Sequence, residues 1–195
     1  MTLTYYPIFL NLKSKKCIVI GGGKVAERKV ISLLKSGADI TLISPELTKR
    51  LKKESSGKKI KYISRRYKKG DLKNAFLVIA ATDSIETNKK VSEDAPRLIN
   101  VVDVPSLCNF IVPSVVKRGP LMIAISTSGV SPSMSKAIRK ELEKLYGTEF
   151  GEYLKSLRKI RAKALTKLKD KKERERFLKR LATAKVIKEL RQKKF

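Results

Sequence analysis

Three small residues near the start of the chain have the types and spacing of a site for a nucleotide diphosphate. Gly21, Gly23 and Ala26 follow a short apolar run with the spacing GxGxxA, and a helical pattern follows directly. Gly21 permits a tight turn, Gly23 lets a pyrophosphate approach the backbone, and Ala26 lets the helix pack on a sheet. The amides at that helix N-terminus favour phosphate. The pattern predicts a dinucleotide site, to which the same turn also contributes Gly22, Lys24 and Val25.

The end of the second apolar run is expected to face the ribose of the nucleotide. An acidic residue commonly accepts the ribose hydroxyls there, but this run ends Ser44-Pro45-Glu46, which places Glu46 two positions late. Ser44 is a neutral alternative, and Thr82 after a later apolar run is a further expected contact. No arginine follows the second run directly, which favours NAD, although the chemistry of these residues leaves NADP open.

A single carboxylate, Asp103, ends a later apolar run. Ligands of open α/β folds bind at the carboxyl ends of their strands, so Asp103 is a candidate for proton chemistry. An aspartate that caps a turn before Pro105 is an equally good interpretation. The residues alone do not decide between them.

Apolar runs of strand length alternate with helical patterns through the first two thirds of the chain, which indicates βαβ units and a parallel sheet. Strands are expected near residues 16–20, 39–44, 60–64, 76–82, 98–103 and 121–126. A helix over 25–35 should stop at Gly37, and Ser131 before Pro132 should cap a helix that reaches about Leu145. Gly147 and Gly151 then interrupt the pattern, and two helices separated near 170–175 are expected in 152–195. The fold class is α/β, with a Rossmann-type sheet followed by a helical C-terminal region.

Composition narrows the chemistry further. The 195 residues include 46 Lys and Arg against 18 Asp and Glu, a formal charge of +28, which attracts nucleic acid, anionic membrane surfaces or small polycarboxylates. The chain has no histidine, so acid and base chemistry must come from carboxylates, lysines or hydroxyls. Cys17 and Cys108 are expected as buried, reduced thiols, and no metal site is predicted. Without an apolar run of about 18 residues the protein is expected to be soluble and cytoplasmic.

Several motifs in order resemble one family. They are Gly21–Lys29, Ala80-Ala-Thr-Asp83, Asn100-Val-Val-Asp103, Cys108-Asn-Phe-Ile-Val-Pro-Ser114 and Ile125-Ser-Thr-Ser-Gly-Val-Ser-Pro132. Together they cover about residues 5–145 and look like the precorrin-2 dehydrogenases that form the N-terminal part of siroheme synthases. No single motif is specific, but the combination is.

The resemblance implies an oxidoreductase that oxidises precorrin-2 to sirohydrochlorin, with NAD as cofactor and Asp103 as the catalytic residue. It also implies a homodimer with an NAD-binding domain over 1–113, a dimerisation region over 114–146 and a basic helical domain over 147–195. Some members insert ferrous iron into the product, but in a chain without histidine we expect little of this ferrochelatase activity.

A substrate of this kind carries carboxylates around its rim, which gives the positive charge a small-molecule partner. The residues expected to contact those carboxylates are Ser126, Thr127, Ser128 and Arg118. Two rival hypotheses are a nucleic-acid-binding protein that uses the basic tail and a regulatory NAD sensor. Residues 151–195 hold 18 Lys and Arg against five Asp and Glu, but few aromatic residues that could stack on bases.

Overall fold

The structure is a computed structural model that describes residues 5–192 of the chain. The chain divides into two compact units, the first ending at Ile111 and the second beginning at Val112. The finer predicted division of the second unit near residue 146 stays a prediction.

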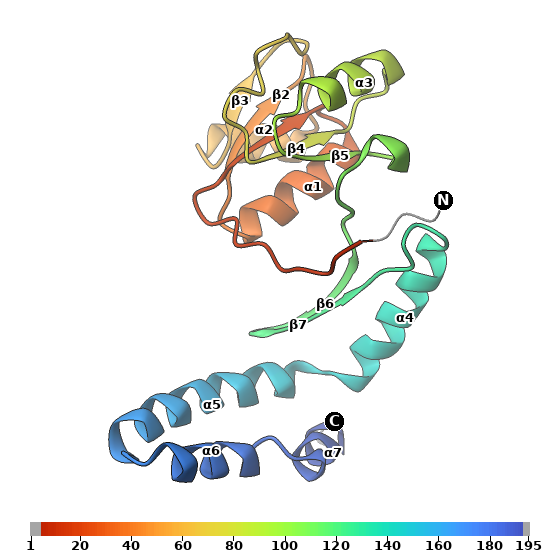
Figure 1. The fold of residues 1–195 in the computed structure, drawn as a ribbon. Coiled ribbons are helices and arrows are strands. Elements are labelled where there is room, and N and C mark those ends of the chain that lie inside the picture. The colour runs from red at the N-terminus through yellow and green to blue at the C-terminus, as the bar shows by residue number, and fades with distance from the viewer. Residues whose placement is uncertain (1–4, 193–195) are drawn as a thin grey trace. The chain divides into compact units, whose positions relative to one another are not determined.

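The first unit is built on a five-stranded parallel sheet (Figure 1). Its strand order is β3-β2-β1-β4-β5, so the strand order reverses beside β1, between β1 and β4. The strands are β1 (Lys16–Ile20), β2 (Asp39–Ile43), β3 (Lys61–Ile63), β4 (Leu77–Ala80) and β5 (Leu98–Val101). All five lie where the apolar runs predict them, with ends one to two residues shorter in most cases. In such sheets the crevice at a reversal of strand order is where ligands bind.

Both faces of this sheet are buried. Cys17 and Val19 of β1 belong to one apolar core, while Ile18 and Ile20 belong to the other. A strand buried on both faces has a continuous apolar sequence, which explains why these runs do not alternate with polar residues.

Three helices complete the first unit: α1 (Lys24–Lys35), α2 (Lys49–Ser56) and α3 (Ile85–Asp94). Side chains of α1 and α2 join the first core, and Val91 of α3 joins the second. The α1 helix ends as predicted, because Gly37 adopts the left-handed φ of +74° that an L side chain rarely accepts. A short 3₁₀ turn over Pro105–Leu107 follows β5.

The second unit begins with an antiparallel ribbon of β6 (Ser114–Arg118) and β7 (Leu121–Ile125). The prediction that residues 121–126 join the parallel sheet is wrong, because they pair with residues 114–118 instead. Sequence reasoning missed β6, since only Val116 within it is fully buried and its sequence, SVVKR, holds no long apolar run. The helix α4 (Pro132–Leu145) packs against this ribbon, and Ser131 caps it as predicted by accepting from the Met134 amide.

Three helices rather than the predicted two follow: α5 (Thr148–Lys167), α6 (Lys171–Arg180) and α7 (Ala184–Gln192). The hydroxyl of Thr183 accepts from the Val186 amide in the manner of an N-cap, which is the missed boundary. Gly147 precedes α5 as expected, but Gly151 lies inside this helix. A Cβ at Gly151 would lie 2.9 Å from the carbonyl of Arg118, so this glycine permits close packing rather than a break. Within the described residues, no helix is both long and apolar enough to cross a membrane.

Candidate dinucleotide site

A cavity of about 690 Å³ opens at the carboxyl ends of β1, β2 and β4. This is the edge of the sheet at which its strand order reverses, and the volume lies within the range of ordinary ligand sites. Seven residues that the sequence predicts as cofactor contacts line it: Gly21, Gly22, Gly23, Ser44, Pro45, Glu46 and Thr82. Lys24 and Val25 lie at the start of α1, beside this lining but not within it.

The three consecutive glycines have three different structural reasons. Gly21 has a φ of +112°, and a Cβ there would lie 2.1 Å from the carbonyl oxygen of Ala81. A Cβ at Gly22 would lie 1.8 Å from the carbonyl oxygen of Glu46. At Gly23 a Cβ would meet no described atom within 4 Å, and the backbone is extended with φ of −77°. Gly21 and Gly22 are therefore needed by the fold, whereas the absence of a side chain at Gly23 leaves the cavity open.

The N-terminus of α1 faces this space with free backbone donors. Gly23 is its N-cap and no side chain caps the helix, so the amides of the first turn are available to an anion. The residues present fit a dinucleotide. The residue at the point of closest approach is a glycine, and amide donors lie at the N-terminus of α1.

The wall formed by residues 44–48 is fixed by contacts that sequence reasoning missed. The hydroxyl of Thr48 donates to the carboxylate of Glu27, and its amide donates to the carbonyl of Gly22 at 3.1 Å. The hydroxyl of Tyr62 donates to the carbonyl of Ser44 at 3.0 Å. These bonds tie the wall to the glycine turn and to β3, and their partners lie too far apart in sequence for a local pattern to reveal them.

The opposite wall is held by Asn88, which is buried at the start of α3. Its amide nitrogen donates to the carbonyl of Thr82 at 2.9 Å, and its carbonyl oxygen accepts from the hydroxyl of Thr82 at 2.8 Å. Thr82 is therefore fixed on both sides, and one orientation of its side chain is set before any ligand binds.

Arg66 also lines the cavity, together with Tyr67. The sequence prediction concerned only the end of β2, where no arginine lies, whereas Arg66 comes from the segment after β3. The guanidinium of Arg65 donates two hydrogen bonds of 2.7 Å to the carboxylate of Asp71, and these bonds hold the two ends of this segment together. Hydrogen bonding to Arg65 lowers the pKa of Asp71 below its usual value.

Asp103 lies two residues beyond β5, exposed and with a left-handed φ of +61°. Aspartate tolerates this conformation better than most residues, and such backbone strain is common at functional sites. The half-buried Lys29 of α1 is its cationic neighbour: burial and then Arg28 lower the pKa of Lys29, while Cys108 and Asp103 act in the opposite direction. Asp103 does not line the cavity itself, but β5 pairs with β4, whose end forms one wall.

The predicted substrate contacts in the second unit differ in whether their side chains already make hydrogen bonds within the protein. The guanidinium of Arg118 donates to three carbonyls, those of Tyr146, Lys117 and Glu143, at 2.9, 3.1 and 3.3 Å. Arg118 thus caps the end of α4, and a contact with substrate has no support from this geometry. Thr127 is occupied with the backbone of Ser131. Ser126 and Ser128 are exposed, and Ser126 accepts from the Ser128 amide.

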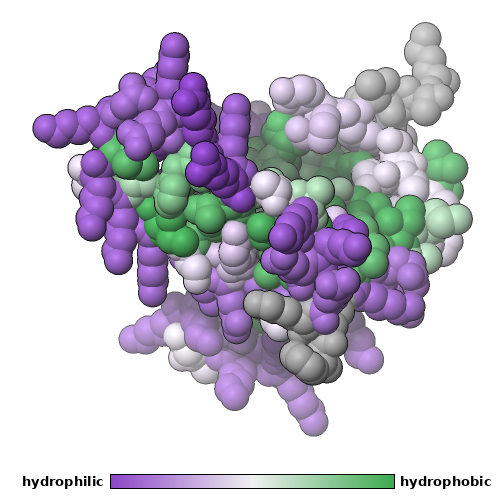
Figure 2. All heavy atoms as spheres, turned by 90° about the horizontal axis from the view of Figure 1, so that it is seen from below, coloured by the Kyte–Doolittle hydropathy of each residue, from purple (hydrophilic) through white to green (hydrophobic). Residues whose placement is uncertain are grey.

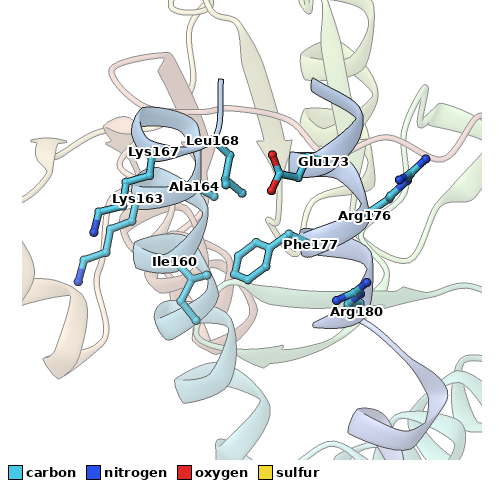
Figure 3. Close-up of a pocket in the computed structure, with 9 residues that line it drawn as sticks. All are labelled: Ile160, Lys163, Ala164, Lys167, Leu168, Glu173, Arg176, Phe177 and Arg180. Atoms are coloured by element: carbon cyan, nitrogen blue, oxygen red, sulfur yellow. The ribbon is translucent and has the colours of Figure 1, made fainter. Parts of the chain in front are cut away.

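A second cavity of about 510 Å³ lies between α5 and α6 (Figure 3). Ile160, Ala164, Leu168 and Phe177 form its apolar interior. Figure 3 shows that the amino groups of Lys163 and Lys167 extend away from this space. The cavity is therefore an apolar groove of the helical pair and not a focus of its positive charge.

Among the described residues, no group of three or more potential metal ligands occurs.

Two family models match the sequence. The family described as "Putative NAD(P)-binding" covers residues 8–114, and the one described as "Sirohaem biosynthesis protein central" covers residues 118–145. The first model spans the whole first unit beyond its opening residues, including the cavity.

Similar curated proteins are siroheme synthases. The one from Methylobacillus flagellatus is 43% identical over 148 residues, which make up 74% of this chain and 32% of that protein. The one from Nitrosospira multiformis is 37% identical over 186 residues, 92% of this chain and 39% of that protein. The chain therefore spans about a third to two fifths of the length of these relatives.

A solved structure matches over nearly its whole length. It is the precorrin-2 dehydrogenase SirC, with a TM-score of 0.82 and 27% sequence identity. The match covers 96% of this chain and 98% of that chain. The predicted fold class, a parallel α/β sheet followed by a helical region, is confirmed.

Proposed function

Since the chain belongs to the NAD(P)-binding family of siroheme biosynthesis proteins, we propose that it is an NAD-dependent precorrin-2 dehydrogenase. The reaction is the two-electron oxidation of precorrin-2 to sirohydrochlorin. The observation that carries the proposal is the open space beside Gly23, at the N-terminus of α1 and in the same crevice as the ends of β2 and β4. It is supported by the similarity to a precorrin-2 dehydrogenase over almost the full length of both chains.

The cofactor contacts follow from the walls of the cavity. The amides of Gly23, Lys24 and Val25 at the helix end would hold the pyrophosphate. Ser44 and Glu46 are placed for the ribose hydroxyls at the end of β2. When bound, NAD supplies the hydride acceptor. The chain's own residues orient it through amide donors and through walls that are hydrogen-bonded before the cofactor arrives.

Asp103 is proposed as the base that accepts the proton released in the reaction. The two-electron oxidation of the substrate releases a hydride and a proton, and the proton must pass to a base. The exposed carboxylate of Asp103 is the base proposed here, at the carboxyl edge of the sheet beside the cofactor cavity. The cationic side chain of Lys29 in α1 is a neighbour of this carboxylate.

The substrate is a polycarboxylate, and the net charge of +28 favours its approach. Ser126 and Ser128, exposed before α4, are the hydroxyls proposed to bind its carboxylates. Arg118 is left out of this proposal because its donors are used at the end of α4.

We also propose that the active form is a homodimer joined through the second unit. Within the described residues, the ribbon of β6 and β7 has no third strand, and an isolated two-stranded ribbon is marginally stable in water. Large apolar side chains of this region are exposed: Val115, Met122, Val130, Met134, Ile138 and Leu145. Figure 2 shows apolar side chains among hydrophilic ones on the face that it presents. Light scattering of the full chain tests this proposal, and a monomer at micromolar concentration would contradict it.

The assay for the main proposal follows sirohydrochlorin by its absorbance after the protein is mixed with precorrin-2 and NAD. Formation of sirohydrochlorin with one NADH per molecule is expected, and NAD binding without turnover would favour the rival sensor.

The same reaction with ferrous iron tests the proposal that iron insertion is inefficient. Cell fractionation tests the proposed cytoplasmic location, and recovery of the protein outside the cytoplasmic fraction would contradict it.

The nucleic-acid rival predicts a different result. It requires binding to generic DNA that weakens steeply with salt, carried by residues 151–195 with their net charge of +13. We expect only weak, nonspecific binding by the full chain, with no effect on turnover.

A further inference from the structure

The thiol of Cys108 is the centre of a small hydrogen-bonded cluster after β5. Its sulfur accepts from the amide of Val101 at 3.1 Å and lies 3.2 Å from the carbonyl oxygen of the same residue. The carbonyl oxygen of Val104 lies 3.4 Å from it, and the side-chain amide of Asn100 donates to it at 3.6 Å. One sulfur therefore touches backbone groups on both sides of Asp103.

These contacts close a loop whose tip is Asp103. Val101 is the last residue of β5, and Val104 precedes the 3₁₀ turn, so the thiol spans the bend of residues 102–103. The next residue fixes the return of the chain: the amide of Asn109 donates to the carbonyl of Ile99 at 3.1 Å, and its side-chain oxygen accepts from the Ile99 amide at 2.8 Å. The bend is thus anchored at its start, middle and end.

The backbone at the tip needs such support. Asp103 has a φ of +61°, in a region that L residues other than asparagine and aspartate seldom occupy. A strained residue of this kind persists only when its surroundings hold it in place. Its own side chain is exposed, so other groups must hold the bend. The Val104 amide donates to the Val101 carbonyl at 3.4 Å, and the Cys108 thiol contacts the carbonyls of both residues.

We propose that Cys108 is a positioning residue for Asp103, whose thiol holds the bend in the conformation that presents the carboxylate to substrate. This rests on the proposed function, because it takes Asp103 as the base of that reaction. The thiol does not touch substrate or cofactor. It acts by keeping the carboxylate within the small range of positions from which it removes a proton.

A neutral thiol suits this task. Burial raises the pKa of Cys108, so the group keeps its proton at neutral pH, while the Val101 amide and Lys29 act in the opposite direction. An S–H group donates to one carbonyl at a time and accepts from an amide with its lone pairs. Serine has the same donor and acceptor capacity, and alanine has neither. The pair of substitutions therefore separates the hydrogen bonds from the packing.

The kinetic test compares Cys108→Ala and Cys108→Ser with the wild-type chain, using precorrin-2 and NAD. In Cys108→Ala we expect kcat to fall about ten- to a hundredfold, the scale of a displacement of about 1 Å at a catalytic group. The KM for NAD should stay within about twofold, since the cavity walls do not include Cys108. Cys108→Ser should recover most of the lost kcat. An alanine variant with wild-type kcat, or with kcat and NAD affinity lost together, would overturn the proposal.

Cys17→Ala is the matched control. This second cysteine is fully buried in β1, and its thiol has no hydrogen bond to the described residues of the loop, so its loss tests whether reduced stability or a missing thiol alone lowers turnover. We expect a lower melting temperature with kcat unchanged. A fall in kcat in Cys17→Ala equal to that in Cys108→Ala would count against a specific role for Cys108.

Amide hydrogen exchange tests the loop independently of activity. In Cys108→Ala the amides of Val101 to Val104 should exchange faster, while those of the glycine turn keep wild-type rates. Unchanged exchange at these amides overturns the positioning role even if kcat falls. Faster exchange together with a wild-type chain that forms no sirohydrochlorin would refute the proposed function and leave the structural clamp standing.

Discussion

Replacement of Gly23 by valine is the sharpest single test of where the cofactor binds. The three adjacent glycines would respond differently to a side chain, and only Gly23 has room for one. Its φ of −77° is open to any L residue, and its Cβ would meet no described atom within 4 Å. The substitution should therefore leave the fold nearly intact, at about 1 kcal/mol or less for an altered N-cap.

The new side chain occupies the space that the pyrophosphate needs. Forcing extra methyl groups against a fixed partner costs about 1–3 kcal/mol, which corresponds to about a 5- to 150-fold weaker Kd. At an NAD concentration 100 times the wild-type Kd, binding stabilises the wild-type protein by about 2.7 kcal/mol. If the Kd rises about 100-fold, the same NAD concentration stabilises the variant by only about 0.4 kcal/mol.

Isothermal titration with NAD and thermal unfolding with and without NAD measure both quantities. Gly57→Ala is the control, because Gly57 also has a negative φ, of −76°, and lies outside the cavity. It should show the cost of an added Cβ without any change in NAD affinity. A folded Gly23→Val protein that binds NAD as tightly as the wild type would refute the placement of the pyrophosphate.

Three further substitutions test other parts of the site. Gly21→Ala should destabilise the fold by about 2 kcal/mol or more, because its φ is +112° and its Cβ would meet the carbonyl of Ala81; denaturant unfolding measures this, and wild-type stability would contradict it. Asp103→Asn keeps the left-handed backbone but loses the base, so kcat should fall about a hundredfold or more with NAD affinity intact; steady-state kinetics check this, and full turnover would remove Asp103 from the mechanism. Arg66→Ala should weaken the binding of NADP more than that of NAD, because a guanidinium at this edge pairs with the 2′-phosphate; equal losses in titrations with the two nucleotides would assign Arg66 another role.

The sheet and the glycine turn could be predicted because their signals are local. Strands buried on both faces must be continuous apolar runs, and a GxGxxA turn between strand and helix has few structural solutions. The same holds for Gly37 and Ser131, where one backbone conformation or one cap explains the residue. These features need no knowledge of distant partners.

The supporting contacts could not be predicted, since they join residues far apart in sequence. Glu27 meets Thr48, Arg66 reaches the cavity from beyond β3, and Arg118 donates to the carbonyl of Tyr146, 28 residues later, at the end of α4. Such partners become neighbours only when the chain folds. The loop of Cys108 is an intermediate case, because a cysteine seven residues beyond the end of a strand does not reveal which carbonyls it will face.

The most direct test of the account is a crystal structure of the protein with NAD bound. We expect the pyrophosphate to lie against the amides of Gly23 and Lys24, with the nicotinamide ring toward the ends of β4 and β5 and the carboxylate of Asp103. A nucleotide bound elsewhere, away from both the glycine turn and Asp103, would contradict it.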